Sequence, residues 1–215
     1  MLVGNRMTRE PITVEPADLL SCAADKMLAG RFRRLPVVSD GKLVGIITER
    51  DLRQHRGHLE HTKVNAAMTE TPVTVSPETL VEEAARIMCE RQIGGLPVID
   101  HDRLIGIITT TDVMHAFLDL MGASNGGSTR IDFVLEGEEH GLVEASRIVA
   151  REGGNILGVG TYRRNPQDNP ICYLRLVLDD IEKLAKALRS SGFNVLGIHR
   201  TRNTPNLAKA TEISG

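Results

Sequence analysis

The sequence predicts an α+β protein in which a β-α-β-β-α unit occurs twice and is followed by a domain of β-α-β-β-α-β order. The first observation behind this prediction is an internal repeat. Residues 7–51 and 68–112 align without a gap at an offset of 61 residues, and 19 of the 45 aligned pairs are identical. The second is a change of pattern after a stretch rich in glycine and serine, 122–128. Self-similarity of this length indicates a duplicated supersecondary unit. Two equivalent units imply pseudo-twofold packing, with a cleft between them that two related sites can share.

Within each repeat, the period of the apolar residues predicts an amphipathic helix followed by a short buried strand. In the second repeat, Ser76-Pro-Glu78 is typical of a helix start, with an N-cap followed by proline. Residues 43–48 and 104–109 read as buried strands, each closed by Thr-x-x-Asp and a second helix. The apolar helix faces comprise Leu19, Leu20, Ala23, Ala24, Met27 and Leu28, and Leu80, Val81, Ala84, Ala85, Ile87 and Met88.

The part after 128 predicts strands at 130–136, 155–162, 171–178 and 193–199 and helices at 142–152 and 181–191, which is the ferredoxin-like order. Gly153 and Gly192 end the two helices, where a left-handed cap is expected. The predicted organisation is therefore repeat 1 (1–61), repeat 2 (62–121), linker (122–128), a third domain (129–200) and a tail (201–215).

The composition excludes several function classes. A net charge of −2 and only six aromatic residues argue against a nucleic-acid surface. No apolar run has the length of a spanning helix and the first residues do not resemble a signal peptide, so we expect a cytoplasmic protein without membrane association. The three cysteines, Cys22, Cys89 and Cys172, are odd in number and unclustered, which indicates reduced, mostly buried thiols.

The repeated strings identify a resemblance. Leu35-Pro-Val37 and Leu96-Pro-Val98, the two Gly-Ile-Ile-Thr strings and the closing aspartates make residues 7–56 and 68–117 resemble a tandem pair of cystathionine-β-synthase (CBS) domains, called a Bateman module. Residues 129–200 resemble an ACT domain, a small regulatory fold that senses amino acids. This second resemblance rests on Gly141-Leu142 and Asn155-Ile156, with Glu138-Glu-His-Gly141 in place of the usual Asp-x-x-Gly or Asn-x-x-Gly.

The CBS resemblance implies that Thr48 with Asp51, and Thr109 with Asp112, bind an adenosyl nucleotide: AMP, ADP, ATP or S-adenosylmethionine. An ionised aspartate accepts hydrogen bonds from both ribose hydroxyls, and a threonine at a helix start lies beside N–H groups that attract phosphate. The alternative is a capping box, although that motif prefers the longer Glu or Gln to Asp. No cofactor is required beyond this regulatory ligand.

The repeats differ just before the Leu-Pro-Val strand, where Arg31-Phe-Arg-Arg34 faces Gln92-Ile-Gly-Gly95. The resemblance implies that these positions reach phosphates held by the other repeat, so that Arg33, Arg34 and Arg50 cluster near Asp112. Arginine suits this role because its guanidinium meets phosphate bidentately. The Asp51 site, facing Gly94, Gly95 and Thr111, would then discriminate phosphate less. The alternative is a solvated basic edge paired with Glu49 or Asp40.

Two weaker patterns remain. In the ACT-like region, Glu138, His140, Gly141 and Asn155 mark the place where the resemblance implies amino-acid binding, with pure dimerisation as the alternative. Three histidines spaced three apart beside Glu60 would suit a transition metal on a helix, but Gly57 interrupts any helix there and a solvated connection is preferred; they are His55, His58 and His61.

No nucleophile elbow or phosphate-binding glycine loop is present in the sequence. We therefore expect no enzyme. The predicted function is that of a homodimeric or larger regulatory sensor which binds a small-molecule nucleotide and acts on an unknown regulated protein. The competing interpretations are an amino-acid sensor whose repeats only dimerise, a structural scaffold, and an enzyme whose sequence shows no catalytic motif.

Overall fold

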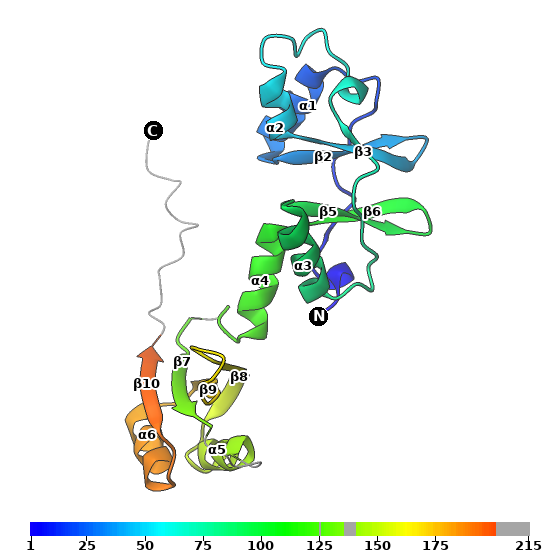
Figure 1. The fold of residues 1–215 in the computed structure, drawn as a ribbon. Helices are drawn as coiled ribbons and strands as arrows, with labels where there is room; N and C mark the ends of the chain where they lie inside the picture. The colour runs from blue at the N-terminus through cyan, green and yellow to red at the C-terminus, as the bar shows by residue number, and fades with distance from the viewer. Residues whose placement is uncertain (125, 136–140, 201–215) are drawn as a thin grey trace, which may run out of the picture. The chain divides into compact units, whose positions relative to one another are not determined.

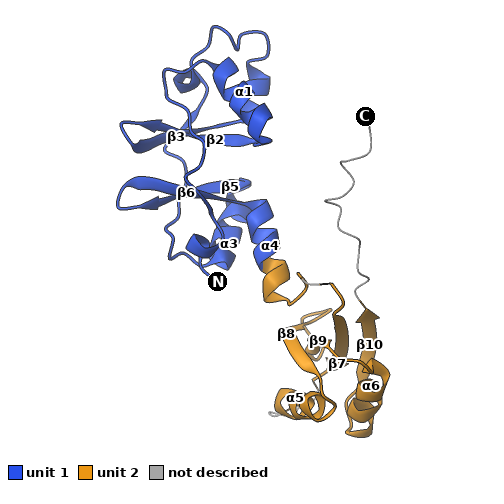
Figure 2. Ribbon diagram, turned by 180° about the vertical axis from the view of Figure 1, so that it is seen from behind, with its two compact units in different colours: residues 1–116 blue, residues 117–215 orange. Residues whose placement is uncertain are grey.

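The computed structural model describes residues 1–124, 126–135 and 141–200. The chain divides into two compact units, Met1–Ala116 and Phe117–Gly215 (Figure 2). The predicted linker, 122–128, follows helix α4 (Thr110–Leu120) and therefore belongs to the second unit. The predicted tail, 201–215, lies outside the described residues. Across the described ranges, no helix combines the length and apolar character that crossing a bilayer requires.

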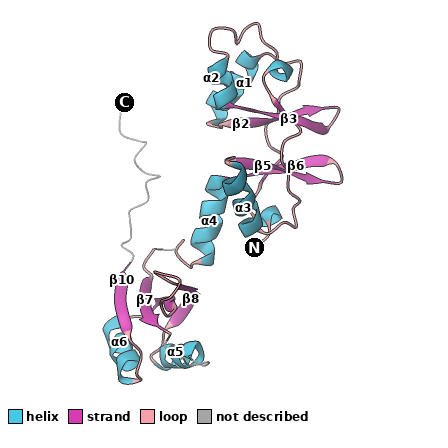
Figure 3. Cartoon of the chain, viewed as in Figure 1, coloured by secondary structure: helices cyan, strands magenta, loops and turns pink. Residues whose placement is uncertain are grey.

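The first unit contains both repeats except the end of α4, which lies beyond Ala116, and each repeat follows the predicted order (Figures 1 and 3). The first repeat comprises η1 (Val3–Asn5), β1 (Thr8–Arg9), α1 (Leu20–Gly30), β2 (Arg34–Ser39), β3 (Lys42–Thr48) and α2 (Glu49–Gln54). The second comprises η2 (Val64–Ala66), β4 (Thr69–Glu70), α3 (Val81–Arg91), β5 (Gly95–Asp100), β6 (Arg103–Thr109) and α4. The order β-α-β-β-α is confirmed in both.

The repeats exchange their first strands. The two three-stranded sheets have the orders β1-β6-β5 and β2-β3-β4, so each sheet contains one strand from the other repeat. Thr8 pairs with Ile107 and, in the equivalent place, Thr69 pairs with Ile46. The sequence pattern does not predict this exchange, because an internal alignment shows which segments are equivalent but not which copy each segment packs against.

The exchange extends into the cores. Val3 and Met7 pack with Leu96 and Val98 in the core of the second repeat, whereas Val64 packs in the core of the first. Glycine makes room for the crossing methionines. A β-carbon at Gly45 would lie 2.6 Å from Sδ of Met68, and one at Gly106 would lie 2.5 Å from Sδ of Met7.

Two predictions about the repeat helices are wrong. Helix α3 begins at Val81, not at Ser76. The Ser76 N–H instead donates to the Thr79 hydroxyl at 3.1 Å, and the Ser-Pro-Glu string forms a turn. Leu19, Leu28 and Leu80 do not share the buried face, because they flank helix ends or face solvent. Met27 and Met88 are buried, as predicted.

The second unit contains a four-stranded antiparallel sheet of order β10-β7-β9-β8, with α5 and α6 packed against it (Figure 3). Its elements are β7 (Thr129–Val134), α5 (Gly141–Arg151), β8 (Asn155–Tyr162), β9 (Ile171–Val177), α6 (Ile181–Ser190) and β10 (Val195–Arg200). The predicted β-α-β-β-α-β order is confirmed. Gly153 and Gly192 follow the helices with φ of 79° and 89°, in the left-handed region predicted for them.

Candidate functional site

Two cavities lie in the first unit, one at each Thr-x-x-Asp motif. The first cavity has a volume of about 500 Å³ and is lined by Thr48 and Asp51; the second has about 460 Å³ and is lined by Thr109 and Asp112. Each is walled by both repeats and includes apolar side chains. Cavities of about 300–1,000 Å³ are typical of small-ligand sites.

The two motifs have the same local geometry, which arises where a strand ends and a helix begins. Asp51 Oδ2 accepts from the Thr48 N–H at 2.8 Å and from its hydroxyl at 2.6 Å. Asp112 Oδ2 accepts from Thr109 at the same two distances. At α2 the Asp51 N–H also donates to the Thr48 hydroxyl oxygen, which completes a capping box. The capping interpretation is therefore correct for the first motif.

Capping leaves each aspartate able to bind a ligand. Both hydrogen bonds that each carboxylate accepts from its threonine use Oδ2, and no described residue donates a hydrogen bond to Oδ1 of Asp51 or Asp112. A carboxylate accepts at both oxygens. The interactions that orient each aspartate thus leave one oxygen for the cavity, and the two interpretations of the motif are compatible.

The arginines are distributed differently from the prediction. Arg33 and Arg34 line both cavities, whereas Arg50 lines only the Asp51 cavity and does not join Asp112. Thr111 lines the Asp112 cavity rather than the Asp51 cavity. The expected contrast between an arginine-rich and an arginine-poor site is therefore wrong. Arg34 pairs with Thr48 in the first-repeat sheet, and its guanidinium lies against Gly94 and Gly95 of the second repeat, so this side chain reaches both cavities.

The charge of the two cavities is in fact similar. Four arginines line the Asp51 cavity together with Glu49 and Asp51, and three arginines line the Asp112 cavity together with Asp112. In each cavity the cations exceed the acids by two. Two of these arginines are absent from the predicted set. Arg53 lies three residues after Arg50 on α2, a spacing that places both on one helix face, and Arg31 begins the arginine string of the first repeat.

Arg34 has an unusual environment. Its Nη1 is buried and has no hydrogen-bond partner among the described residues. Its guanidinium fills the space next to the second repeat's glycines: a β-carbon at Gly94 would lie 2.6 Å from Nη2, and one at Gly95 would overlap Nη1. Burial, followed by the charge of Arg33, lowers the pKa of Arg34. No ion pair joins Arg33, Arg34 or Arg50 to a described acidic side chain, so the alternative of a paired basic edge is wrong for this part of the chain.

The predicted amino-acid site is only partly described. Glu138 and His140 lie outside the described residues. Gly141 is the buried first residue of α5, and Asn155 is the exposed first residue of β8. The binding role of these four residues stays a prediction.

The histidines between the repeats do not form the metal site that their spacing would suit on a helix. The His55 ring Nδ1 lies 2.9 Å from the carbonyl oxygen of Asp51. Within the described ranges, no three His, Cys, Asp or Glu side chains form a group that could hold a metal ion.

The three cysteines are free, but Cys89 is exposed and only Cys172 is fully buried. Burial, and then the charge of Asp132, raises the pKa of the Cys172 thiol to about 11.

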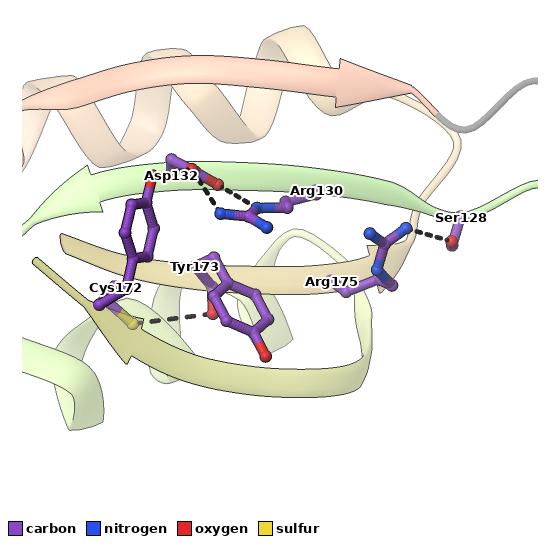
Figure 4. A network of polar contacts seen from close by, with 7 residues as sticks. Ser128, Arg130, Asp132, Cys172, Tyr173 and Arg175 are labelled. Carbon is purple, nitrogen blue, oxygen red and sulfur yellow. Dashed lines mark hydrogen bonds and ion pairs between the residues drawn. The ribbon is translucent and has the colours of Figure 1, made fainter. Parts of the chain in front are cut away.

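A polar network in the second unit is missing from the predicted sites (Figure 4). Asp132 is 4% exposed and accepts from Arg130 Nε at 2.6 Å, Arg130 Nη2 at 2.8 Å and the Tyr162 hydroxyl at 2.9 Å. The Arg130 guanidinium also lies 4.4 Å from the centre of the Tyr173 ring. The sequence signal was Arg-x-Asp in a strand, since alternate residues share one face of a sheet.

Burial alone would raise the pKa of Asp132. The hydrogen bonds from Arg130 and Tyr162, with the charges of Arg130 and His199, outweigh burial and hold the pKa of Asp132 below its usual value. The bond to Asp132 raises the pKa of Tyr162. The network therefore keeps an ionised carboxylate on a sheet face opposite to the helices.

Two equivalent repeats with exchanged strands, enclosing paired cavities, define a class of tandem ligand-binding modules. The chain belongs to the CBS-domain family: the CBS domain model matches residues 3–58 and 64–119.

Several known proteins are similar to about half of this chain. A CBS domain-containing protein of Dictyostelium discoideum is 35% identical over 136 residues, which are 56% of this chain and 94% of the relative. The solved structure of CBSX2 in complex with AMP is 31% identical, with a TM-score of 0.51, over 54% of this chain and 96% of that one. The CBS pair of protein MJ0100, in complex with 5-methylthioadenosine and S-adenosyl-L-methionine, is 30% identical with a TM-score of 0.51, over 54% and 95%.

A candidate acetoin utilization protein (AcuB) from Vibrio cholerae is also similar, at 32% identity and a TM-score of 0.51, over 56% of this chain and 92% of that one. Some relatives are enzymes. The inosine-5'-monophosphate dehydrogenase of Korarchaeum cryptofilum is 39% identical, but the match covers only 22% of its length. The chain thus spans less than a quarter of that enzyme and resembles it only through the CBS domains.

Proposed function

We propose that the chain is a cytoplasmic regulatory sensor that binds an adenosyl nucleotide in each of the two cavities of its CBS pair. The observation that carries this proposal is the repeated site itself: two cavities of similar volume, each with an aspartate whose Oδ1 receives no hydrogen bond from the described part of the chain, and both lined by Arg33 and Arg34. The AMP-bound and S-adenosylmethionine-bound structures at about 30% identity support it.

The chemistry of each cavity suits the parts of such a ligand. Asp51 or Asp112 accepts from the ribose hydroxyls through Oδ1, because Oδ2 is already occupied. Arginines meet a phosphate or carboxylate. Apolar residues such as Ile46 and Pro72 in one cavity, and Ile12 and Pro36 in the other, provide surfaces for adenine. Phe32 is the one aromatic lining residue of these two cavities and belongs to the second.

Regulation follows from where the cavities lie. Each is walled by both repeats, so a bound ligand favours the arrangement of the repeats that closes on it. A regulated protein that recognises this arrangement would respond to ligand concentration. The role is regulatory rather than catalytic, and the nucleotide is a ligand rather than a cofactor.

For the second unit we propose an ACT-like role in assembly, with amino-acid sensing as an additional activity. Its β-α-β-β-α-β order and four-stranded sheet support this assignment. The similarity to the candidate AcuB of Vibrio cholerae supports acetoin utilisation as the regulated process. Growth on acetoin of a strain lacking the gene tests that process, and unimpaired growth would contradict it.

A thermal-shift screen of AMP, ADP, ATP, S-adenosylmethionine and amino acids tests the function. A ligand at 100 times its dissociation constant stabilises the folded state by about 2.7 kcal/mol. We expect adenosyl nucleotides to raise the melting temperature. Stabilisation by amino acids alone would favour the ACT-like region as the only sensor, and no stabilisation by either class would favour a scaffold.

Replacement of Asp112 separates ligand binding from capping. Asp112→Asn keeps an oxygen that accepts from Thr109 but loses the charge, whereas Asp112→Ala loses both. We expect calorimetry to show about 10- to 150-fold weaker nucleotide binding at this site in both variants, because a charge-assisted bond is worth about 1.5–3 kcal/mol. Only Asp112→Ala should also lose about 1 kcal/mol of stability. Unchanged affinity in both would mean that Asp112 is a cap alone.

A further inference from the structure

Arg34 is a side chain that the two cavities share. It lines both of them, and its guanidinium lies against Gly94, which lines both, and Gly95, which lines the Asp51 cavity. Gly95 is the residue equivalent to Arg34 in the second repeat, since the two are 61 positions apart. Each chain therefore holds one guanidinium where a symmetric pair would hold two, and two guanidinium groups would not fit, because even a β-carbon at Gly95 would overlap Nη1.

The guanidinium of Arg34 lacks an acceptor for one of its donors in the described part of the chain. Nη1 is buried without a hydrogen-bond partner among the described residues, and a buried cationic donor without a partner is costly. An anionic group entering either cavity would relieve that cost by accepting from Arg34. Only the first such group can do so fully, because after it binds the guanidinium is paired.

We propose that the shared Arg34 couples the two cavities, so that a phosphate-bearing adenosyl ligand in one cavity weakens the binding of a second one in the other. This inference rests on the proposed function and specifies its regulation. The second ligand meets an Arg34 that is already neutralised and also the charge of the first phosphate. A ligand without phosphate has no anionic group that accepts from Arg34, so adenosine should bind the two cavities without this coupling. Over a range of ligand concentrations, the chain would hold one nucleotide rather than two.

Arg33 provides a matched control. It lines the same two cavities, but its side chain is exposed and no β-carbon built at a glycine meets it. An exposed guanidinium has room to move and is screened by solvent. We expect Arg33 to contribute to affinity in both cavities without coupling them.

Calorimetric titration of the full chain with AMP and with adenosine tests the coupling. In the native protein, the ratio of the second to the first dissociation constant should be at least about 10-fold larger for AMP than for adenosine, which corresponds to about 1.4 kcal/mol. Arg34→Gln should bring the AMP ratio down to that of adenosine. Arg33→Gln should weaken both AMP steps and keep the ratio.

The melting temperature of ligand-free Arg34→Gln checks its fold. It should equal or exceed that of the native protein, because the substitution removes a half-buried cation whose buried Nη1 has no hydrogen-bond partner among the described residues. Two AMP steps that are no further apart than those of adenosine would overturn the coupling and leave the proposed function standing. A large AMP ratio that persists in Arg34→Gln would overturn Arg34 as its carrier. Failure of AMP, ADP, ATP and S-adenosylmethionine alike to bind would overturn the proposed function itself.

Discussion

Arg34 and Gly95 show how a duplicated unit diverges at single residues. They are equivalent in the repeat, yet one carries a guanidinium and the other carries no side chain, and the guanidinium fills the space that this absence leaves. The two sites can therefore remain similar in shape while one charge is shared between them. The same complementarity recurs at Gly45 and Gly106, where the missing side chains admit Met68 and Met7.

Also at the residue scale, the lowered pKa of Asp132 predicts that the stability of the second unit falls in acid. A carboxyl with a lowered pKa stabilises the fold above the pKa of an unfolded aspartate, about 3.9, and this stability is lost as the pH falls through its own lower pKa. Asp132→Asn should lower the free energy of unfolding by about 1–3 kcal/mol at pH 7, because it replaces a buried charge-assisted acceptor. The difference in free energy of unfolding between this variant and the native protein should shrink below about pH 4.

Tyr162 and Tyr173 give this prediction a specific readout. They are the only tyrosines of a chain without tryptophan, and both lie at the network. Near-ultraviolet circular dichroism of the tyrosines therefore follows this unit during unfolding. Asp179→Asn, which changes an exposed aspartate after β9, is the matched control and should change stability little. An Asp132→Asn protein as stable as the control at pH 7 would contradict the role assigned to the network.

At the scale of elements, the exchange of first strands determines how the two repeats depend on each other. The segment that contains η1 and β1 belongs to the first repeat in sequence but packs in the core of the second. Loss of either copy would therefore expose the core of the other. The arrangement also places each Thr-x-x-Asp motif in a cavity whose walls come from both copies.

Substitutions of Val3, in η1, and of Leu2, just before it, test this exchange. Val3 is fully buried in the second-repeat core, whereas Leu2 is 39% exposed. Val3→Ala should destabilise the first unit by about 1–3 kcal/mol through the cavity it leaves, and Leu2→Ala should change stability by less than about 0.5 kcal/mol. Hydrogen exchange in α3 and β5 locates the effect. If Val3→Ala accelerated exchange only in α1 and β2, the segment would belong to the first-repeat core in solution.

At the scale of the whole molecule, we expect a homodimer or a larger assembly. Strands β10 and β8 are the edges of the second unit's sheet, and edge strands offer unpaired backbone groups. Helix α4 exposes Met114, Phe117 and Leu120, which is unusual for large apolar side chains close together on one helix. Light scattering at micromolar concentration should give at least twice the 23.5 kDa of one chain. A monomeric mass would remove the assembly role proposed for the second unit.

What the sequence determined by itself was the repeated order of elements, the β-α-β-β-α-β order of the third domain, and the two motifs. These depend on local periodicity, glycine positions and internal similarity, all of which are visible along the chain. The predicted start of the helix after Ser76 failed because a Ser-Pro-Glu string caps a turn as readily as a helix, and only packing of Val81 and its neighbours decides which residues become helical.

The tertiary structure alone decided which copy supplies each first strand and which cavity each arginine reaches. Strand exchange joins Thr8 with Ile107, 99 residues apart, and Ile46 with Thr69, 23 residues apart, and sequence similarity within the chain is the same whichever copy a first strand pairs with. The placement of Arg34 in both cavities likewise depends on the path of the backbone through the paired repeats, whereas Arg50 directly precedes Asp51 in the sequence and shares its helix. Residue type indicates what a side chain binds, but only the fold brings two sites within reach of one charge.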